Sequence, residues 1–279
     1  MYKVGQNSKV NADSIQIHET VTIGDNVKIN CESIKLGKFC KIGNNVEISC
    51  TSFESDSFLF MWKGVEIGRG GCYGVNSTVK IGKGVGIFED TIINPSEPVE
   101  IGDYCGIGAE VMIWTHGAWL DITQGFPSDF GSVKIGNNVW LPARSIVLPN
   151  VTIGNNVVIG INSIINRGLP DGCFAAGSPC KVIKENVYPK KLSEDEIRKM
   201  VEDILSDWKV LCDKKGITRS IKVQYENGKI YLNQSHFETI YSIDDRIIEG
   251  HTNDVSEDLR DYLRRRGIKF FTDKGFRSI

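Results

Sequence analysis

Histidine is the side chain best suited to accept a proton at neutral pH, because the ordinary pKa of its imidazole lies near that range. Only one histidine, His116, lies in the long segment 114–132, WTHGAWLDITQGFPSDFGS, which also carries two tryptophans and two aspartates. This placement makes His116 the candidate for a general base that takes the proton of a hydroxyl group, and the alternative is a loop histidine without a role. His18 is expected at the surface, and no function is predicted for His236 and His251.

Several residues near His116 in the sequence are candidates to orient it. Asn94, in TIINPSEPVEIG, is predicted to orient the histidine or the acceptor. The alternative interpretation of Asn94 is a turn residue before Pro95. A carboxylate could also pair with His116, and the sequence does not choose among the candidates. These are Glu89, Asp90, Asp121 and Asp129.

Aromatic and acidic residues in and after the same segment are predicted to contact the substrate. Trp114 and Asp121 lie within the segment itself, and Trp140 follows a Gly-Asn-Asn-Val corner. The flat ring of Trp140 could be a platform for a substrate, or it could equally be a packing residue beneath the loop.

The elements that must position these residues follow a period of six. Bulky aliphatic residues recur at that spacing, and a small or β-branched residue stands four places after most of them. The aliphatic positions of the most regular part are Ile135, Leu141, Val147, Ile153, Ile159 and Ile165. Six matches neither the period of an α-helix nor that of a single strand, so each unit is predicted to be a short strand and a turn stacked on its neighbours. The sequence therefore predicts a stacked β-solenoid.

The same period extends towards the amino terminus, with interruptions. It begins at Ile17, gains one residue after Ile29, and continues from Leu36. Residues 51–64, TSFESDSFLFMWKG, are expected to interrupt it with an aromatic patch that packs on a neighbouring subunit. The period is expected to return at Ile67 and Val75. Asn-Asn and Gly-Asp pairs at the corners are typical of tight left-handed backbone positions.

The repeats end near Lys184, and the composition changes from Ser193 onward. Ser193 and Glu196 predict a capping box at the start of a helix. The run IKVQYENGKIYL predicts a hairpin around Asn227-Gly228, and a second helix is expected over 254–266 before a short strand IKFFT. We therefore expect a solenoid domain over residues 1–189, with a loop excursion at 114–132, and a small α+β appendage over 190–279.

The overall composition excludes several classes of protein. The formal net charge is −2, so no positive field favours nucleic acid or an anionic membrane surface. The amino terminus MYKVGQNSKV lacks the apolar run of a signal peptide, and no stretch of about 18 apolar residues predicts a membrane span. A soluble, cytoplasmic protein is therefore expected.

The eight cysteines show no CxxC pair and no histidine-rich spacing, so no metal site is predicted. Cys40 and Cys105 fall in small-residue positions of the repeat, where a free thiol acts as a small hydrophobe. All eight are expected to be reduced packing residues. They are Cys31, Cys40, Cys50, Cys72, Cys105, Cys173, Cys180 and Cys212.

The run IGNNVWLPARSIVLPNVTIGNNVVIGINSIINRGLPDGCFAAGSPCKVIK resembles the carboxyl-terminal signature of the hexapeptide-repeat, left-handed β-helix acyltransferases. It is most similar to the O-acetyltransferase branch, which includes maltose, galactoside and capsular-polysaccharide acetyltransferases. The resemblance covers about residues 10 to 184 and is most specific over 133–184. It implies a left-handed parallel β-helix and a homotrimer, with acetyl-CoA bound in grooves between subunits.

The resemblance also implies a set of residues that bind the acetyl-CoA donor. Backbone groups of Ala143 and Ile161 match positions along the pantetheine arm, and Asn166 takes a place often filled by threonine near the adenine. Basic residues at the end of the repeats match positions that meet the CoA phosphates, and AAGSPCKVIK matches the family's closing motif. The implied set is Ala143, Ile161, Asn166, Arg167, Ser178, Lys181 and Lys184.

The expected activity is acetyl-CoA-dependent O-acetylation of a sugar hydroxyl, with a surface polysaccharide or its precursor as the saccharide acceptor. The nearest alternative is N-acetylation of a nucleotide-linked amino sugar, which is disfavoured because such enzymes often carry an amino-terminal βαβ domain. A non-catalytic solenoid that serves as an assembly subunit is a third possibility. A zinc-dependent carbonic anhydrase is rejected, because the repeats hold only His18 and His116 where three histidine ligands are needed. The sequence does not identify the acceptor.

Overall fold

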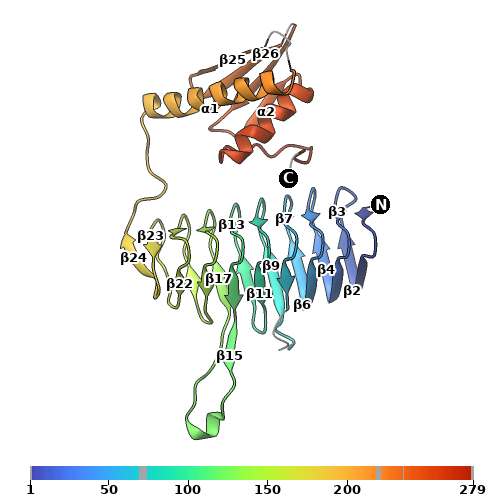
Figure 1. The fold of residues 1–279 in the computed structure, drawn as a ribbon, viewed down its shortest axis with the longest axis vertical. Coiled ribbons are helices and arrows are strands. Elements are labelled where there is room, and N and C mark those ends of the chain that lie inside the picture. Colours follow the sequence, from blue (N-terminus) through green and yellow to red (C-terminus); the bar gives the residue numbers. More distant parts are fainter. Residues whose placement is uncertain (1, 69–73, 218–220, 235, 278–279) are drawn as a thin grey trace. The chain divides into compact units, whose positions relative to one another are not determined.

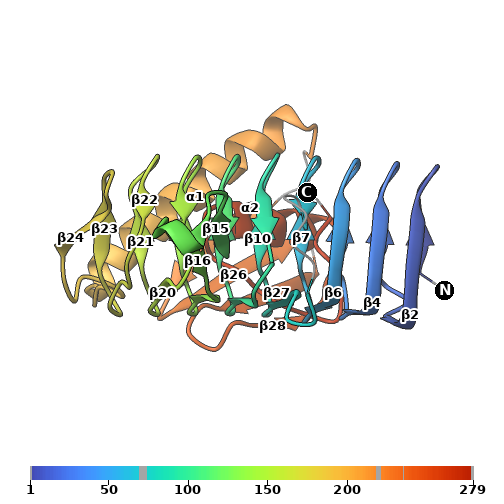
Figure 2. The same cartoon turned by 90° about the horizontal axis from the view of Figure 1, so that it is seen from below.

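The computed structural model describes residues 2–68, 74–217, 221–234 and 236–277. Contacts divide the chain into two compact units, one up to Lys190 and one from Lys191. The first unit is a parallel β-solenoid, which confirms the predicted stacking of six-residue units (Figures 1 and 2).

Each coil of the solenoid passes through three faces. Face 1 is a single sheet of short strands, parallel except for the antiparallel last pair. In sheet order its strands are β1 (Lys3–Val4), β3 (Thr22–Ile23), β5 (Lys41–Ile42), β7 (Phe60–Met61), β10 (Gly86–Ile87), β13 (Gly106–Ile107), β18 (Trp140–Leu141), β21 (Val158–Ile159), β23 (Phe174–Ala176) and β24 (Lys181–Lys184).

Faces 2 and 3 meet in three long strands that turn a corner, namely β2 (Lys9–Ile17), β4 (Lys28–Leu36) and β6 (Glu47–Ser55). Strand β6 pairs with β8 at one end and with β9 at the other, so the two faces diverge from it. Face 2 continues through β8 (Glu66–Ile67), β11 (Ile92–Asn94), β14 (Met112–Trp114), β19 (Ile146–Val147) and β22 (Ile164–Ile165). Face 3 continues through β9 (Thr78–Ile81), β12 (Val99–Ile101), β17 (Val133–Ile135) and β20 (Thr152–Ile153).

The aliphatic residues of the repeat stack in register inside the solenoid. Ile107 of one coil lies beside Leu141 of the next, and both are fully buried. Seven of the cysteines are free thiols, and Cys40 and Cys105 are among the buried core residues. Cys72 lies outside the described residues.

The Asn-Asn corners have two structural roles. The second asparagine adopts a left-handed backbone, with φ of 55° at Asn138 and 57° at Asn156. The first accepts a hydrogen bond from the preceding coil, as Asn155 Oδ1 does from the Asn137 backbone N–H at 2.8 Å. A Cβ on Gly136 would lie 2.8 Å from the backbone of Gly154, so only glycine allows the coils to approach this closely.

Residues 51–64 do not interrupt the solenoid, and the expected interruption is wrong. Phe53, Leu59 and Met61 lie in the core, because larger apolar side chains here fill positions that aliphatic residues occupy elsewhere. Val75 was expected to be a core position, but it is 87% exposed.

The excursion at 114–132 leaves the corner between faces 2 and 3 as an antiparallel hairpin. Strands β15 (His116–Ala118) and β16 (Ser128–Phe130) form its arms, and a 3₁₀ turn, Ile122–Gln124, lies near its tip. The hairpin projects away from the coils (Figure 1).

The second unit contains a four-stranded antiparallel sheet and two helices. Its elements are α1 (Glu194–Lys214), β25 (Ile221–Glu226), β26 (Lys229–Gln234), β27 (Phe237–Ser242), β28 (Ile247–Gly250) and α2 (Asp254–Arg265). The Ser193–Glu196 capping box and the hairpin at Asn227-Gly228 are confirmed. The strand predicted over 268–272 does not form, because the Phe270 side chain enters the core and its carbonyl accepts from Arg260 Nε at 3.0 Å.

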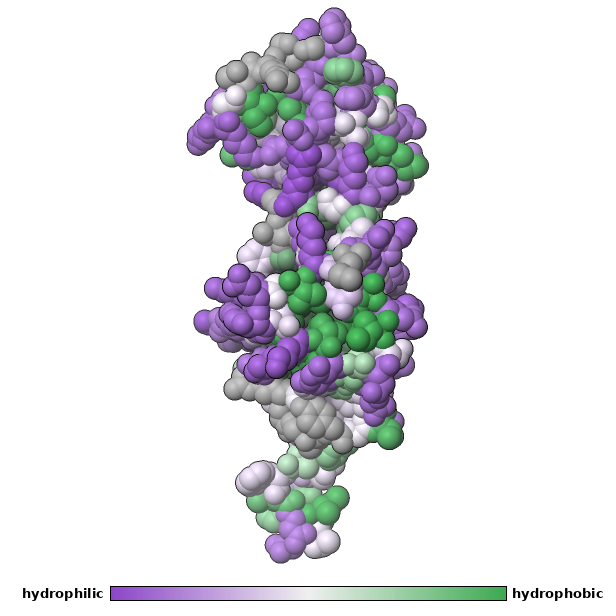
Figure 3. All heavy atoms as spheres, turned by 90° about the vertical axis from the view of Figure 1, so that its right-hand side faces the viewer, coloured by the Kyte–Doolittle hydropathy of each residue, from purple (hydrophilic) through white to green (hydrophobic). Residues whose placement is uncertain are grey.

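The amino-terminal end of the solenoid leaves apolar side chains partly uncovered, as Figure 3 shows. Val4 is 47% exposed and Ile15 46% exposed. Within the described ranges, no helix is both long enough and apolar enough to cross a membrane.

Candidate active site

His116 lies at the base of the hairpin and contacts two polar side chains of the neighbouring coil. Its Nδ1 is 2.8 Å from the amide oxygen of Asn94 and 2.9 Å from the hydroxyl oxygen of Ser96. Asn94 and Ser96 are buried, with 1% and 6% of their surface exposed, whereas His116 is only partly buried. The buried pair therefore anchors an imidazole that remains partly exposed to solvent.

The parallel register of two strands brings these residues together. Asn94 ends β11 and stands opposite Trp114, which ends β14. The next residue, Thr115, is fully buried and donates its hydroxyl to the Asn94 carbonyl at 2.7 Å. The same hydroxyl oxygen accepts from the Glu97 backbone N–H at 3.0 Å. Thr115 thus fixes the two strand ends against each other directly before His116.

The hydrogen bonds determine which imidazole nitrogen carries the proton. The Ser96 backbone N–H donates to Asn94 Oδ1 at 3.4 Å, which identifies that atom as the amide oxygen. An amide oxygen only accepts, so His116 Nδ1 must be the donor in their contact. In the neutral ring the lone pair is then on Nε2, the nitrogen that faces away from Asn94.

Aromatic rings surround the imidazole. Phe130, opposite His116 in the hairpin, stacks on it with centroids 5.5 Å apart and an interplanar angle of 24°. Trp114 meets it edge to face at 6.3 Å. These contacts limit the rotation of the ring without using its nitrogens.

The predicted carboxylate candidates lie elsewhere. Glu89 and Asp90 occupy the corner between faces 1 and 2, and Asp129 lies on β16 opposite Gly117. Asp121 caps the 3₁₀ turn, where it accepts from the hydroxyl of Thr123 at 2.6 Å and from its backbone N–H at 2.9 Å. These donors lower the pKa of Asp121. The structure thus gives Asp121 a structural role at the hairpin.

Trp140 lies on face 1, apart from the corner that carries His116. Its ring covers Gly106 of the adjacent coil, where a Cβ would lie 2.4 Å from the indole Cε3. The ring is nevertheless 42% exposed. Trp140 therefore packs on the coil and still offers a surface to solvent.

The residues predicted to bind the donor divide between two corners. Ala143 and Ile161 lie between faces 1 and 2, and the Ile161 side chain is 69% exposed. Asn166 and Arg167 follow β22 at the corner between faces 2 and 3, which is also the corner of His116. The other three predicted residues, Ser178, Lys181 and Lys184, follow the last coil and are exposed.

Face 2 lies between these two corners and presents an apolar row to the outside. The row consists of Ile92, Met112, Ile146 and Ile164, which stand in register on successive coils. All four are partly buried, whereas the alternate residues of the same strands, such as Ile113 and Val147, point into the core.

The hairpin tip is also apolar and is the most exposed apolar part of the solenoid unit's described residues. Trp119 is 95% exposed, Ile122 64% and Leu120 54%. Single exposed apolar residues are ordinary, but a contiguous group of this kind marks an interaction site.

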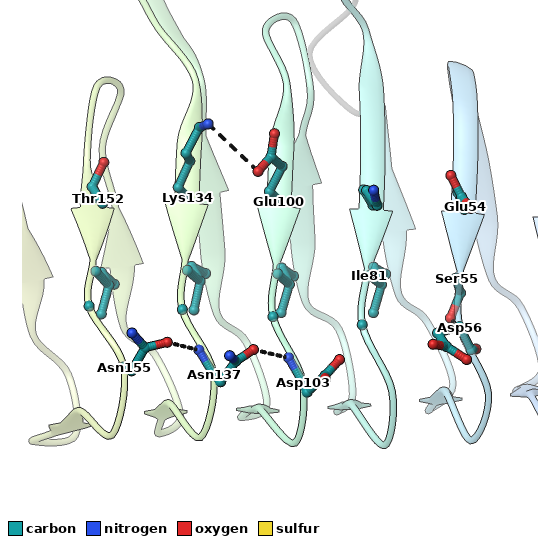
Figure 4. A pocket seen from close by; sticks show the side chains of 18 of the residues that line it. Glu54, Ser55, Asp56, Ile81, Glu100, Asp103, Lys134, Asn137, Thr152 and Asn155 are labelled. Carbon is teal, nitrogen blue, oxygen red and sulfur yellow. Dashed lines mark hydrogen bonds and ion pairs between the residues drawn. The ribbon is translucent and has the colours of Figure 1, made fainter. Parts of the chain in front are cut away.

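A groove of 810 Å³ runs along the corner between faces 3 and 1. Its wall is a row of charged and polar residues from successive coils, among them Glu54, Glu100, Lys134 and Thr152 (Figure 4). Lys134 Nζ lies 3.7 Å from Glu100 Oε2, so part of the row is neutralised internally. The groove does not include His116 or Asn94.

Among the described residues, no three side chains of histidine, cysteine, aspartate or glutamate come close enough together to hold a metal ion. The corner with His116 holds an imidazole oriented by Asn94 and Ser96 beside the apolar row of face 2.

Sequence reasoning identified Asn94 and His116 but missed Ser96 and Thr115. Their types carry no distinctive signal. Aligning the strands coil by coil would have placed Asn94 opposite Trp114, and Ser96 and Thr115 are each within two residues of that pair. An alignment of successive repeats in the sequence was therefore the signal that could have found Ser96 and Thr115.

Comparison with known proteins gives matches concentrated in the solenoid. A family model described as bacterial transferase hexapeptide (six repeats) matches residues 132–167. Galactoside O-acetyltransferase of Escherichia coli (strain K12) is 49% identical over 53 residues, which are 19% of this chain and 26% of that protein. The chain thus matches only about a quarter of that relative's length.

A longer match is to the putative lipopolysaccharide biosynthesis O-acetyl transferase WbbJ of Escherichia coli (strain K12). It is 34% identical over 131 residues, which cover 40% of this chain and 67% of that protein. Among solved structures, the polySia specific acetyltransferase NeuO has a TM-score of 0.48 and 20% identity, over 69% of this chain and 90% of that chain.

Proposed function

This chain belongs to the bacterial hexapeptide-repeat transferase family, and from that premise we propose that it transfers an acetyl group from acetyl-CoA to a sugar hydroxyl. The observation that carries the proposal is the hydrogen bond from His116 Nδ1 to Asn94 Oδ1, which leaves Nε2 as a base. A surface polysaccharide or its precursor is the proposed acceptor, supported by the relative named as a lipopolysaccharide O-acetyl transferase.

In the proposed reaction, His116 Nε2 takes the proton of the acceptor hydroxyl as its oxygen attacks the thioester carbonyl. A backbone N–H or a polar side chain stabilises the tetrahedral oxyanion. Collapse of that intermediate breaks the C–S bond, and the CoA sulfur leaves with the proton that the imidazolium returns. Asn94 keeps the proton on Nδ1 throughout, so the ring does not have to change tautomer between turnovers.

The side chains at the proposed donor site match the chemical groups of CoA. Lys181, Lys184 and Arg167 are exposed cations suited to phosphate groups. The corner at Ala143 and Ile161, beside the apolar row of face 2, suits the uncharged pantetheine arm. When bound, acetyl-CoA supplies the activated acyl group, and the chain supplies its position and the base.

We also propose that the active unit is a homotrimer. Within one copy, His116 and the Ala143–Ile161 corner lie on opposite sides of face 2. A neighbouring copy would bring a second corner to His116 and would cover the apolar row of face 2 and the hairpin tip around Trp119. Burial of these apolar side chains would favour association.

The experiment that tests the function measures thiol release from acetyl-CoA with a panel of mono-, oligo- and polysaccharides. Wild type and His116→Ala are compared side by side. Acceptor-dependent release that is lost in the variant supports the proposal. Release with amino sugars alone would instead indicate N-acetylation, and acetyl-CoA binding without release on any acceptor would favour a non-catalytic assembly subunit.

A further inference from the structure

Two thiols of adjacent coils are in contact at the corner between faces 2 and 3. Cys31 Sγ and Cys50 Sγ lie 3.8 Å apart, and the two residues are direct partners in the register of β4 and β6. Neighbouring strands in a sheet lie about 4.8 Å apart. This spacing falls within the Cα separations that a disulfide bridges, so side-chain rotation alone can close the remaining gap between the sulfurs.

Cys31 is partly exposed, unlike the buried cysteines among the described residues of the solenoid, and Cys50 lies directly beneath the same depression. Both residues line this open depression together with Asp13 and Thr51. Cys50 is 6% exposed. In contrast, Cys40 is enclosed in the core, where it donates to the Asp56 carbonyl at 3.1 Å and burial raises its pKa to about 11.

The contact between the thiols also differentiates them. The hydrogen bond between the two thiols lowers the pKa of Cys31, and the same contact, together with burial, raises the pKa of Cys50. The more exposed sulfur is therefore the one that more readily becomes the nucleophilic thiolate.

We propose that Cys31 and Cys50 are a redox-modification site, which forms a reversible intrachain disulfide with a small-molecule disulfide as oxidant. The Cys31 thiolate attacks one sulfur of the oxidant and displaces the first small thiol, which gives a mixed disulfide. Cys50, after losing its proton, attacks Cys31 Sγ and displaces the second small thiol. Two protein thiols are oxidised, and one small disulfide is reduced to two thiols.

The bond would join consecutive coils 19 residues apart in the chain, near the partly uncovered end of the solenoid. Closing such a loop restricts the unfolded chain and stabilises the folded one. Serine is the nearest replacement in size, and Ser33 Oγ and Ser52 Oγ already form a pair of this kind in the same two strands at 2.9 Å.

The test incubates the full chain with oxidised glutathione and then measures free thiols, intact mass and melting temperature. The expected product is two hydrogen atoms lighter, has a Cys31–Cys50 linked peptide, and melts roughly 5–10 °C higher. Dithiothreitol should reverse all three changes. The double variant Cys31→Ser/Cys50→Ser should melt like the reduced wild type and show no shift on oxidation.

Single variants separate the steps. Cys50→Ser should stop at a glutathione adduct on Cys31, because the resolving thiol is missing, whereas Cys31→Ser should react little. A wild-type product that retains glutathione on Cys31 would overturn the proposal, as would a linkage between any other two cysteines. Unchanged mass and thiol content after oxidation would also overturn it.

Discussion

The imidazole Nδ1 of His116 lies 2.8 Å from the amide oxygen of Asn94, a residue 22 positions earlier in the chain. The contact joins two coils, and it exists because β11 and β14 end side by side in parallel register. The partner is a neutral amide, which fixes the ring and its tautomer without adding a negative charge. The proposed base would thus be oriented before any substrate binds, which is the arrangement that efficient proton transfer requires.

Replacing His116 by alanine should lower turnover by about 10²–10⁴, the usual effect of losing a general base. Binding of acetyl-CoA should change little, because the proposed donor contacts at Lys181, Lys184 and the Ala143–Ile161 corner do not include the His116 side chain. Turnover is measured by thiol release and affinity by calorimetry. His18→Ala is the matched control, because His18 contacts Thr20 in the first coils. Wild-type turnover in the His116 variant would contradict the assignment.

Replacing Asn94 by alanine should lower turnover by about tenfold or more, because Nδ1 would lose its amide acceptor and keep the contact with the Ser96 hydroxyl, which can donate as well as accept. Ser96→Ala should have a smaller effect, since the Asn94 contact remains. The measurement is the turnover number together with the Michaelis constant for acetyl-CoA, which should be almost unchanged. Because Asn94 is buried, melting temperatures are recorded for both variants. If the turnover of both variants fell only in proportion to their loss of melting temperature, Asn94 would have a structural role and no role in orienting the histidine.

Substituting the hairpin tip should weaken self-association. In the double variant Trp119→Ser/Ile122→Ser, both changed side chains are mostly exposed within one copy, so the fold of the copy should be retained. Sedimentation should show a shift from trimer towards monomer, with lower activity at low protein concentration. Val75→Ser, at a position that is 87% exposed, is the control and should leave the mass unchanged. An unaltered trimer in the double variant would show that the tip is not part of the interface.

Removing the cations after the last coil should raise the Michaelis constant for acetyl-CoA. Lys181→Ala and Lys184→Ala should each raise it by about tenfold, because a hydrogen bond to a charged group contributes roughly 1.5–3 kcal/mol. Added salt should reduce the difference between wild type and the variants. Lys28→Ala, which removes a cation paired with Glu47 on an early coil, should have no effect. A change in turnover alone would count against a phosphate contact.

The solenoid was predictable because the same pattern of buried residues recurs in each six-residue unit. An aliphatic residue every six positions, with asparagine or glycine at the corners, admits one way of stacking, and Ile135, Leu141 and Val147 follow it. The prediction failed in residues 51–64, where larger apolar residues occupy the core positions that aliphatic residues fill in other repeats. Phe53 and Met61 are larger than the usual residues, and the run that contains them looked like an interruption although both are in the core.

The site was only partly predictable. His116 stood out because histidine is rare in this chain, but its partner Ser96 belongs to a turn whose path depends on the coil length. Likewise, sequence offered four carboxylates for His116, while the structure supplies an amide from the strand alongside. Contacts between coils depend on register, and register is set by the insertions at each corner, which a six-residue period alone does not specify.

The last prediction concerns the unit from Lys191 onward, which should fold when expressed alone as residues 191–279. Its core is its own: Leu205, Tyr241 and Leu259 pack together with none of the solenoid's residues in the cluster. Trp208 is the only tryptophan in this segment, is fully buried, and donates its indole N–H to Asp258 at 2.9 Å. Its emission should therefore be that of a shielded indole and should shift to the red in a single cooperative transition with denaturant.

Two variants test this core. Asp258→Asn retains an acceptor and should fold similarly, whereas Leu259→Ala should lower the unfolding free energy by about 2–5 kcal/mol. Solvent-like emission in buffer without denaturant would mean that this unit depends on the rest of the chain.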